Sequence, residues 1–291
     1  MISVQLAGGV GNQLFQYYLG QYLQLKKGVP VSYIPPKIEK SHPQSSIRFF
    51  FPEENYIDNQ SQMGIVGRGF LKISKSNQFT KKILLPIVKE YSSDRPGMDH
   101  LVSKVSTKSR ISGYFQTGFY FDYCINRGIS KPKLLNSSIW YVENSKIFKE
   151  EEPASIHLRF GDYLKYRQTI GNLNEQFYLQ ALENLMERKS YKNIYCFTDD
   201  LKKSFNMLQN SKFIKNIKFI DPPNNSGPNE SRLLQSQAAG HIISNSTFSW
   251  WAANLSTQEC VIAPKKWFFG MDDPEELLPS NWLLQESRWE K

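Results

Sequence analysis

The sequence has little cysteine and no long apolar run. Its three cysteines, Cys124, Cys196 and Cys260, are far apart and form no CxxC pattern, which argues against a disulfide framework or a structural zinc site. We therefore expect a reducing, cytoplasmic environment. No run of about 18 apolar residues predicts a membrane-spanning helix. Residues 1–7 also lack the charged and apolar segments of a signal peptide.

Acidic residues are outnumbered by basic ones. The 291 residues include 36 Lys and Arg against 27 Asp and Glu, a net charge of +9. Such a balance favours an anionic partner: a nucleic acid, a lipid headgroup or a phosphorylated ligand. The lysines are scattered and no nucleic-acid-binding motif accompanies them, so we expect no nucleic acid. Attraction to an anionic inner membrane is a simpler use of the charge. With 40% hydrophobic and 22% charged residues, the composition excludes a disordered or fibrous chain.

The amino-terminal segment predicts a strand, a glycine loop and a helix. The strand covers residues 2–6, the loop GGVGN covers residues 8–12, and an amphipathic helix follows that ends at Gly28. Residues 29–34 predict the next strand, which indicates a parallel sheet. Residues 36 to about 110 show no sustained period, and we expect loops and helices there.

The glycine loop permits two interpretations. Glycines between a strand and a helix allow a phosphate to approach backbone amides, but the same loop can simply form a tight turn. The dinucleotide fingerprint fails because Leu14 stands where glycine or alanine is required, and no carboxylate follows at the ribose position. This argues against a nicotinamide-dependent oxidoreductase. Asn12, at the end of the loop, is also a candidate helix cap.

The chain from Pro153 onward alternates strands and helices. We predict strands at 155–160, 193–198, 216–220, 241–244 and 260–263, and helices at 177–186, after Asp200, and at 233–239 and 247–255. Together these elements predict an α/β protein with two Rossmann-like domains, 1–150 and 151–291. The charged stretch 143–153 is the predicted link.

The segment SIHLRFGDY at residues 155–163 combines polar and apolar residues in alternation. On a strand, Ser155, His157 and Arg159 lie on one face and the intervening apolar residues on the other. The carboxyl ends of parallel strands border the ligand crevice, so Arg159 is a candidate phosphate ligand. The alternative is an ion pair between Arg159 and Asp162, with His157 as a hydrogen-bonded core histidine.

Two further polar segments follow predicted strands. In FTDD, Asp199 or Asp200 is expected to cap the next helix, and the Asp-x-Asp spacing of metal-dependent sugar transferases is absent, so we predict no metal. In NSTF, at residues 245–248, hydroxyl and amide groups at a helix start form a plausible anion site. Of the adjacent Trp250 and Trp251, at least one is expected to pack in the core.

Three motifs together resemble glycosyltransferase family 11, the α-1,2-fucosyltransferases that use GDP-fucose. They are GGVGNQLFQY at 8–17, HLRFGDY at 157–163 and NSTFSWWAANL at 245–255; GYFQ at 113–116 is a weaker fourth. The resemblance implies a GT-B architecture in which the carboxyl-terminal domain holds the donor and the amino-terminal domain the acceptor. It implies no metal and no cofactor, because GDP-fucose is a substrate.

The resemblance also implies roles for individual residues. Arg159 would bind the donor diphosphate with His157 nearby, and Gly9, Gly11 and Asn12 would face the same cleft from the other domain. The remaining donor-side candidates are Asp199, Asp200, Glu230, Asn245, Ser246, Thr247 and Phe248. The family's central motif has a second arginine where this chain has Phe160, and often an acidic residue where this chain has Ser231, with Glu230 one place early.

The expected reaction is an inverting transfer of L-fucose from GDP-β-L-fucose to O2 of a terminal β-galactoside. The setting would be bacterial surface glycan (O-antigen) synthesis on a galactose-terminated, lipid-linked acceptor, with peripheral association at the cytoplasmic face of the inner membrane. Residues 36–135 would recognise the acceptor. Asp162 and His157 are candidate catalytic bases. The alternatives are a fucosyltransferase of another linkage and a basic nucleic-acid-binding protein.

Overall fold

The computed structural model divides the chain into two compact units. It describes residues 1–36, 46–57, 89–161, 166–224, 226–257, 260–274 and 276–290. The first unit contains residues 1–130 and 274–276, and the second contains residues 131–273 and 277–291. The division therefore lies earlier than residue 150. The stretch 143–153 that we predicted as a link is mostly helical, within α6 (Ile139–Glu151), because the Ser138 side chain caps the helix and its charged residues remain exposed.

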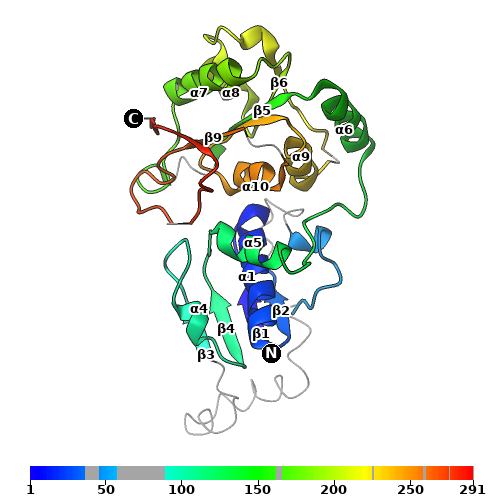
Figure 1. The fold of residues 1–291 in the computed structure, drawn as a ribbon, viewed down its shortest axis with the longest axis vertical. Coiled ribbons are helices and arrows are strands. Elements are labelled where there is room, and N and C mark those ends of the chain that lie inside the picture. The colour runs from blue at the N-terminus through cyan, green and yellow to red at the C-terminus, as the bar shows by residue number, and fades with distance from the viewer. Residues whose placement is uncertain are drawn as a thin grey trace, which may run out of the picture. The chain divides into compact units, whose positions relative to one another are not determined.

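The first unit contains a four-stranded parallel sheet in the order β2-β1-β4-β3 (Figure 1). The elements in chain order are β1 (Ile2–Gln5), α1 (Val10–Lys27), β2 (Val31–Ile34), a 3-10 turn (Ile47–Phe49), β3 (Lys89–Ser92), α4 (Leu101–Lys104), β4 (Ser109–Ser112) and α5 (Gly118–Ile125). The parallel pairing of the first two strands confirms the prediction. Strand β3 was not predicted, because it is a mostly exposed edge strand whose sequence KEYS has no apolar alternation.

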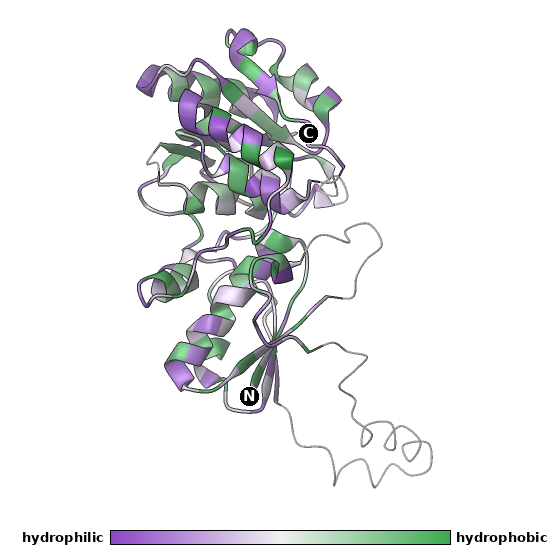
Figure 2. Ribbon diagram, turned by 90° about the vertical axis from the view of Figure 1, so that its right-hand side faces the viewer, coloured by the Kyte–Doolittle hydropathy of each residue, from purple (hydrophilic) through white to green (hydrophobic). Residues whose placement is uncertain are grey.

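Helix α1 forms because its apolar residues recur at helical spacing. Leu14, Tyr18 and Leu19 are fully buried, and hydrophobic and hydrophilic residues alternate along the helix in Figure 2. Gly28 ends the helix in the left-handed conformation, with φ 64°, as glycine permits. The helix begins at Val10 with Gly9 as the N-cap. Asn12 therefore lies in the first turn, and the interpretation of Asn12 as the helix cap is wrong.

The second unit contains a six-stranded parallel sheet in the order β10-β9-β8-β5-β6-β7. Strands β5, β6 and β9 of this sheet are labelled in Figure 1. After α6 its elements are β5 (Ala154–Leu158), α7 (Glu175–Arg188), β6 (Ile194–Thr198), α8 (Leu201–Leu208), a 3-10 turn (Ile214–Asn216), β7 (Ile217–Phe219), α9 (Pro228–Gln235), β8 (Gly240–Ile242), α10 (Thr247–Leu255), β9 (Val261–Pro264) and β10 (Leu283–Gln285). Helix α9 begins earlier than the predicted 233, because Pro228 suits the first helical position. Strand β10 was not predicted.

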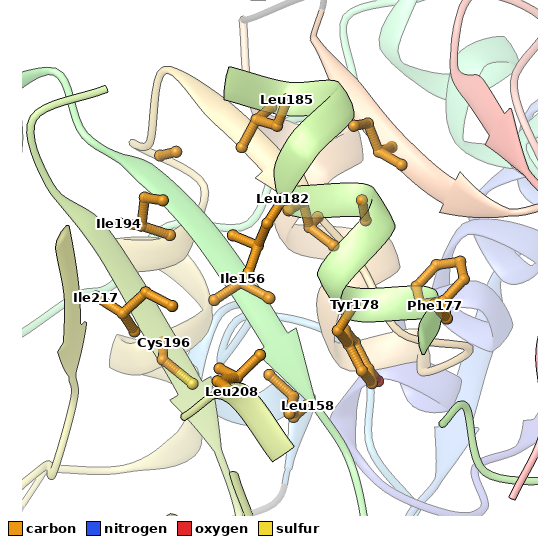
Figure 3. Close-up of a cluster of buried hydrophobic side chains, with 14 of the residues drawn as sticks. Ile156, Leu158, Phe177, Tyr178, Leu182, Leu185, Ile194, Cys196, Leu208 and Ile217 are labelled. Carbon is orange, nitrogen blue, oxygen red and sulfur yellow. The ribbon is translucent and has the colours of Figure 1, made fainter. Parts of the chain in front are cut away.

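The alternation predicted along β5 is confirmed. Ile156 and Leu158 pack with the apolar face of α7, where Leu182 and Leu185 are fully buried (Figure 3). Phe160 belongs to the same cluster, so it lies on the face opposite to the polar residues of β5. The two adjacent tryptophans are both fully buried.

The order of strands in the second sheet places a topological switch between β5 and β8. From β5 the chain continues to β6 and β7 on one side, and then crosses to β8 and β9 on the other side. In open α/β sheets, ligands bind at the carboxyl ends of the strands at such a switch. In the first sheet, β1 likewise lies between β2 and β4. None of the helices within the described residues meets the length and apolarity needed to span a bilayer.

Candidate functional site

His157 connects the two strands at the switch point of the second sheet. It is buried near the carboxyl end of β5, and its Nδ1 lies 2.7 Å from the Oγ of Ser244, which follows β8. Its ring stacks on Phe248 of α10, with centroids 5.0 Å apart and planes 19° apart. These contacts agree with the interpretation of His157 as a hydrogen-bonded buried histidine, and they hold its ring in one orientation.

The environment of His157 disfavours the charged imidazolium. Burial, followed by the positive charges of Arg159 and Arg232, lowers the pKa of His157 to about 3. The ring is therefore neutral at physiological pH and is a weak base. This suits a positioning role better than proton transfer.

Arg159 follows β5 and pairs with an aspartate on the neighbouring strand's carboxyl end. Its Nη1 lies 3.0 Å from Oδ2 of Asp199, with the two side chains 29% and 24% exposed. The other carboxylate oxygen of Asp199 accepts a hydrogen bond from the backbone N–H of Phe160 at 2.9 Å. Asp199 therefore orients the Arg159 guanidinium while leaving part of it accessible. The expected alternative partner, Asp162, lies outside the described residues.

The next aspartate, Asp200, has a different role. Its side chain accepts a hydrogen bond from the backbone N–H of Lys203 at 2.9 Å and caps α8, as was predicted for one of the two aspartates. Within the described residues no three His, Cys, Asp or Glu side chains gather at one point.

The amino terminus of helix α10 follows shortly after the carboxyl end of β8 in the chain. The Ser246 hydroxyl caps the helix by accepting a hydrogen bond from the N–H of Phe248, and the first turn, which starts at Thr247, contains no acidic residue. The first turn therefore supplies no counter-charge for the partial positive charge of the helix end. Asn245, just before this helix, has a structural contact instead. Its Nδ2 donates hydrogen bonds to the carbonyl oxygens of Ile170 and Gly171, which links that loop to the segment after β8.

Glu230, a donor-side candidate, has a structural contact. Its two carboxylate oxygens accept hydrogen bonds from the backbone N–H and the hydroxyl of Ser138, both at 2.6 Å. This joins α9 to the start of α6. The structure therefore gives this carboxylate a contact within the protein, and its contact with the donor stays a prediction.

Sequence reasoning missed Arg232, a buried cation on α9. Its side chain is 3% exposed, its Nη1 lies 3.1 Å from Oδ1 of Asn229, and its guanidinium lies 4.7 Å from the ring centroid of Phe248. Burial lowers the pKa of Arg232 to about 9, so the group is still a cation at neutral pH. The sequence did contain an indication that this arginine is buried, because Arg232 directly precedes an uncharged stretch that leads into β8.

In the first unit, the glycine loop and the GYFQ segment meet. The Oδ1 of Asn12 accepts a hydrogen bond from Nε2 of Gln116 at 2.9 Å, and Nε2 of Gln16 donates to the carbonyl oxygen of Gly113 at 2.7 Å. The two segments follow the adjacent strands β1 and β4. Gln116 was not predicted as a site residue, although its Oε1 is buried and has no partner among the described residues.

The glycines of the loop differ in whether the surrounding protein requires glycine at that position. A Cβ built on Gly9 would contact nothing within 4 Å, so the protein itself does not require glycine there. Gly8, with φ +70°, does require glycine. Gly11 is buried in the first turn of α1. The arrangement leaves room beside Gly9 for a ligand.

The two units with parallel sheets have the GT-B fold. A solved structure of a family 9 glycosyl transferase from Veillonella parvula covers 98% of this chain and 86% of its own, with a TM-score of 0.50 and 9% identity. This match shows the shared fold alone.

The sequence comparisons agree with the family resemblance. Residues 142–280 match glycosyl transferase family 11. An Escherichia coli alpha-1,2-colitosyltransferase is 25% identical over 98% of this chain and 99% of its own. The E. coli O-antigen biosynthesis glycosyltransferase WbnK is 27% identical over 96% and 98%. These findings confirm the resemblance to glycosyltransferase family 11 that the motifs carry.

Proposed function

We propose that this enzyme transfers L-fucose from GDP-β-L-fucose to O2 of a terminal β-galactoside, with inversion, during O-antigen synthesis. The observation that carries the donor assignment is the partly exposed Arg159 guanidinium, oriented by Asp199 beside the switch point of the second sheet. The α-1,2 linkage and the O-antigen setting are supported by the names of the two E. coli relatives.

The proposed chemistry places the largest electrostatic demand on the leaving group. The acceptor hydroxyl attacks the anomeric carbon, the bond from that carbon to the β-phosphate oxygen breaks, and GDP departs with the bonding electrons. Arg159 and the amino terminus of α10 are fixed positive groups that stabilise this developing charge. They need no reorganisation at the moment of reaction.

The proton of the acceptor hydroxyl requires a base. His157 serves poorly, because its ring bonds Ser244 and its pKa is lowered by burial and by the two arginines. We assign it to positioning Phe248 and the end of β8, and we keep Asp162 as the candidate base. The amide pair of Asn12 and Gln116 is the candidate acceptor contact in the first unit.

A second donor is favoured by one of the relatives. The E. coli colitosyltransferase aligns with nearly the whole chain, and colitose is L-fucose without its 3-hydroxyl. A diphosphate site would serve both GDP-sugars equally. Discrimination would then depend on groups that contact one hydroxyl of the sugar.

The test is transfer from labelled GDP-L-fucose and GDP-colitose to a panel of galactosides, with and without EDTA. We expect fucose transfer to a β-galactoside that survives the chelator, with the new linkage at O2 by NMR. Preferential use of GDP-colitose would establish the second candidate. The absence of transfer from both donors, together with no binding of GDP, would contradict the proposal.

A further inference from the structure

Arg232 is buried without an acidic partner among the described residues. Its side chain is 3% exposed, and no ion pair joins it to a carboxylate among the residues that the structure describes. Its partners there are the neutral amide of Asn229 and the ring of Phe248, and its Nε has no hydrogen-bond partner. A buried charge without a counter-ion is costly, so proteins seldom retain one without a compensating ligand or a pair.

Two carboxylates on or near the elements around Arg232 have partners of their own. Glu230, two residues before Arg232 on the same helix, accepts both of its hydrogen bonds from Ser138. Asp199 pairs with Arg159. Neither of these two carboxylates therefore pairs with Arg232.

Arg232 is connected to the proposed donor site through stacked groups. Its guanidinium lies over the Phe248 ring, and the same ring stacks on His157, whose strand continues into Arg159. Phe248 also belongs to the first turn of α10, which has no acidic residue. Two guanidinium groups and a helix amino terminus thus surround the carboxyl ends of β5 and β8.

We propose that Arg232 is a second cation for the donor diphosphate, acting from the buried side of the site while Arg159 acts from its accessible side. This rests on the proposed function only in taking the ligand to be a sugar nucleoside diphosphate. The ligand's phosphates supply the counter-charge that none of the described carboxylates provides. Because the group lies in a low-dielectric environment, its attraction for the phosphates is weakly screened by salt.

The experiment compares the wild-type protein with Arg232→Met, Arg232→Lys and the matched control Arg288→Met, which removes an exposed arginine from the same unit. Calorimetry measures the binding of GDP and of inorganic pyrophosphate. Ligand-observed NMR measures the binding of guanosine, which has no phosphate. Thermal unfolding without ligand reports whether each variant folds.

We expect Arg232→Met to weaken GDP and pyrophosphate about 10-fold to 100-fold, as for loss of a charged hydrogen bond, and to leave guanosine binding unchanged. We also expect its ligand-free melting temperature to stay level or rise, because an uncompensated buried charge has been removed. Arg232→Lys should recover part of the affinity, and Arg288→Met should match the wild type.

Two results would overturn the role of Arg232. One is unchanged GDP and pyrophosphate binding in Arg232→Met. The other is an equal loss of GDP and guanosine binding with a lower melting temperature, which would mean that the arginine is structural. A wild type that binds pyrophosphate but not GDP would contradict the proposed nucleotide, and Arg232 would then be judged on pyrophosphate alone. A wild type that binds neither would overturn both proposals.

Discussion

At the residue scale, the role that we propose for Arg159 is chemical rather than structural. Its ion pair with Asp199 is partly exposed, and such pairs contribute about 0–1 kcal/mol to stability. Arg159→Ala should therefore leave the urea midpoint nearly unchanged while lowering kcat by about 10² to 10³, the usual effect of losing one preorganised group. Arg159→Lys should lose nearly as much, because an ammonium does not reproduce the planar fork. Near wild-type turnover in both variants would remove Arg159 from the mechanism.

Two buried histidines among the described residues predict a loss of stability in mild acid. Burial, with the two arginines, lowers the pKa of His157 to about 3, and burial lowers that of His241 to about 4. The unfolded state, with an ordinary pKa near 6.5, binds protons first, so stability is complete above about pH 6.5 and falls as the pH decreases towards 4. Each histidine contributes a slope of about 1.4 kcal/mol per pH unit in that window.

Urea unfolding at pH 7.5, 6.0 and 5.0 measures this slope. His241→Gln is the informative variant, because it removes one titrating group that lies outside the proposed chemistry. Its unfolding free energy should decline less steeply with acid than that of the wild type. An identical decline in the two proteins would show that other groups cause the acid sensitivity.

At the element scale, the junction after β5 depends on a glycine. A Cβ on Gly161 would lie 2.5 Å from Oδ2 of Asp199 and 3.4 Å from Cζ of Arg159. Gly161→Ala should therefore displace the Asp199–Arg159 pair and lower kcat by about tenfold or more, since a misplacement of about 1 Å can have large kinetic effects. The comparison is Asp199→Asn, which weakens the same pair without adding volume. Unaltered kinetics in both variants would mean that the pair does not orient Arg159.

Helix α7 stabilises the sheet from the face opposite to the site. Leu182 is fully buried against Ile156 and Leu158 (Figure 3). Leu182→Ala should lower the unfolding free energy by about 2–5 kcal/mol, the range for a cavity in a packed core. Urea unfolding checks the loss, and the KM for donor in the folded fraction should be unchanged. A loss below about 1 kcal/mol would show that the helix can close over the deleted volume.

At the scale of the whole molecule, the assignment of the donor to the second unit stays a prediction that hydrogen exchange can test. GDP should protect the backbone amides that follow β5, β6 and β8 and those in the first turn of α10, because bound ligands suppress local opening. Strands β2 and β3 of the first sheet serve as an internal control and should exchange at unchanged rates. Protection confined to the first unit would reverse the assignment of the two domains.

The sequence by itself determined the class of fold and the identity of most donor-side candidates. Alternation along 155–160 and the helical period of α1 are local properties of the backbone, so they are visible without the structure. Polar residues directly after apolar strands likewise indicated where ligand-binding groups would gather. The motifs around Asn12, His157 and Ser246 carried the family resemblance.

Only the tertiary structure decided the partners of these residues. Asp199 forms an ion pair with Arg159, Ser138 donates hydrogen bonds to Glu230, and Gln116 donates one to Asn12. The partners in each pair are far apart in the sequence. Strand order and helix placement bring such groups together, and neither is encoded in the local pattern of a segment. The lack of an acidic partner for Arg232 within the described residues became visible for the same reason: the neighbours of a buried charge are set by packing, and local sequence does not specify them.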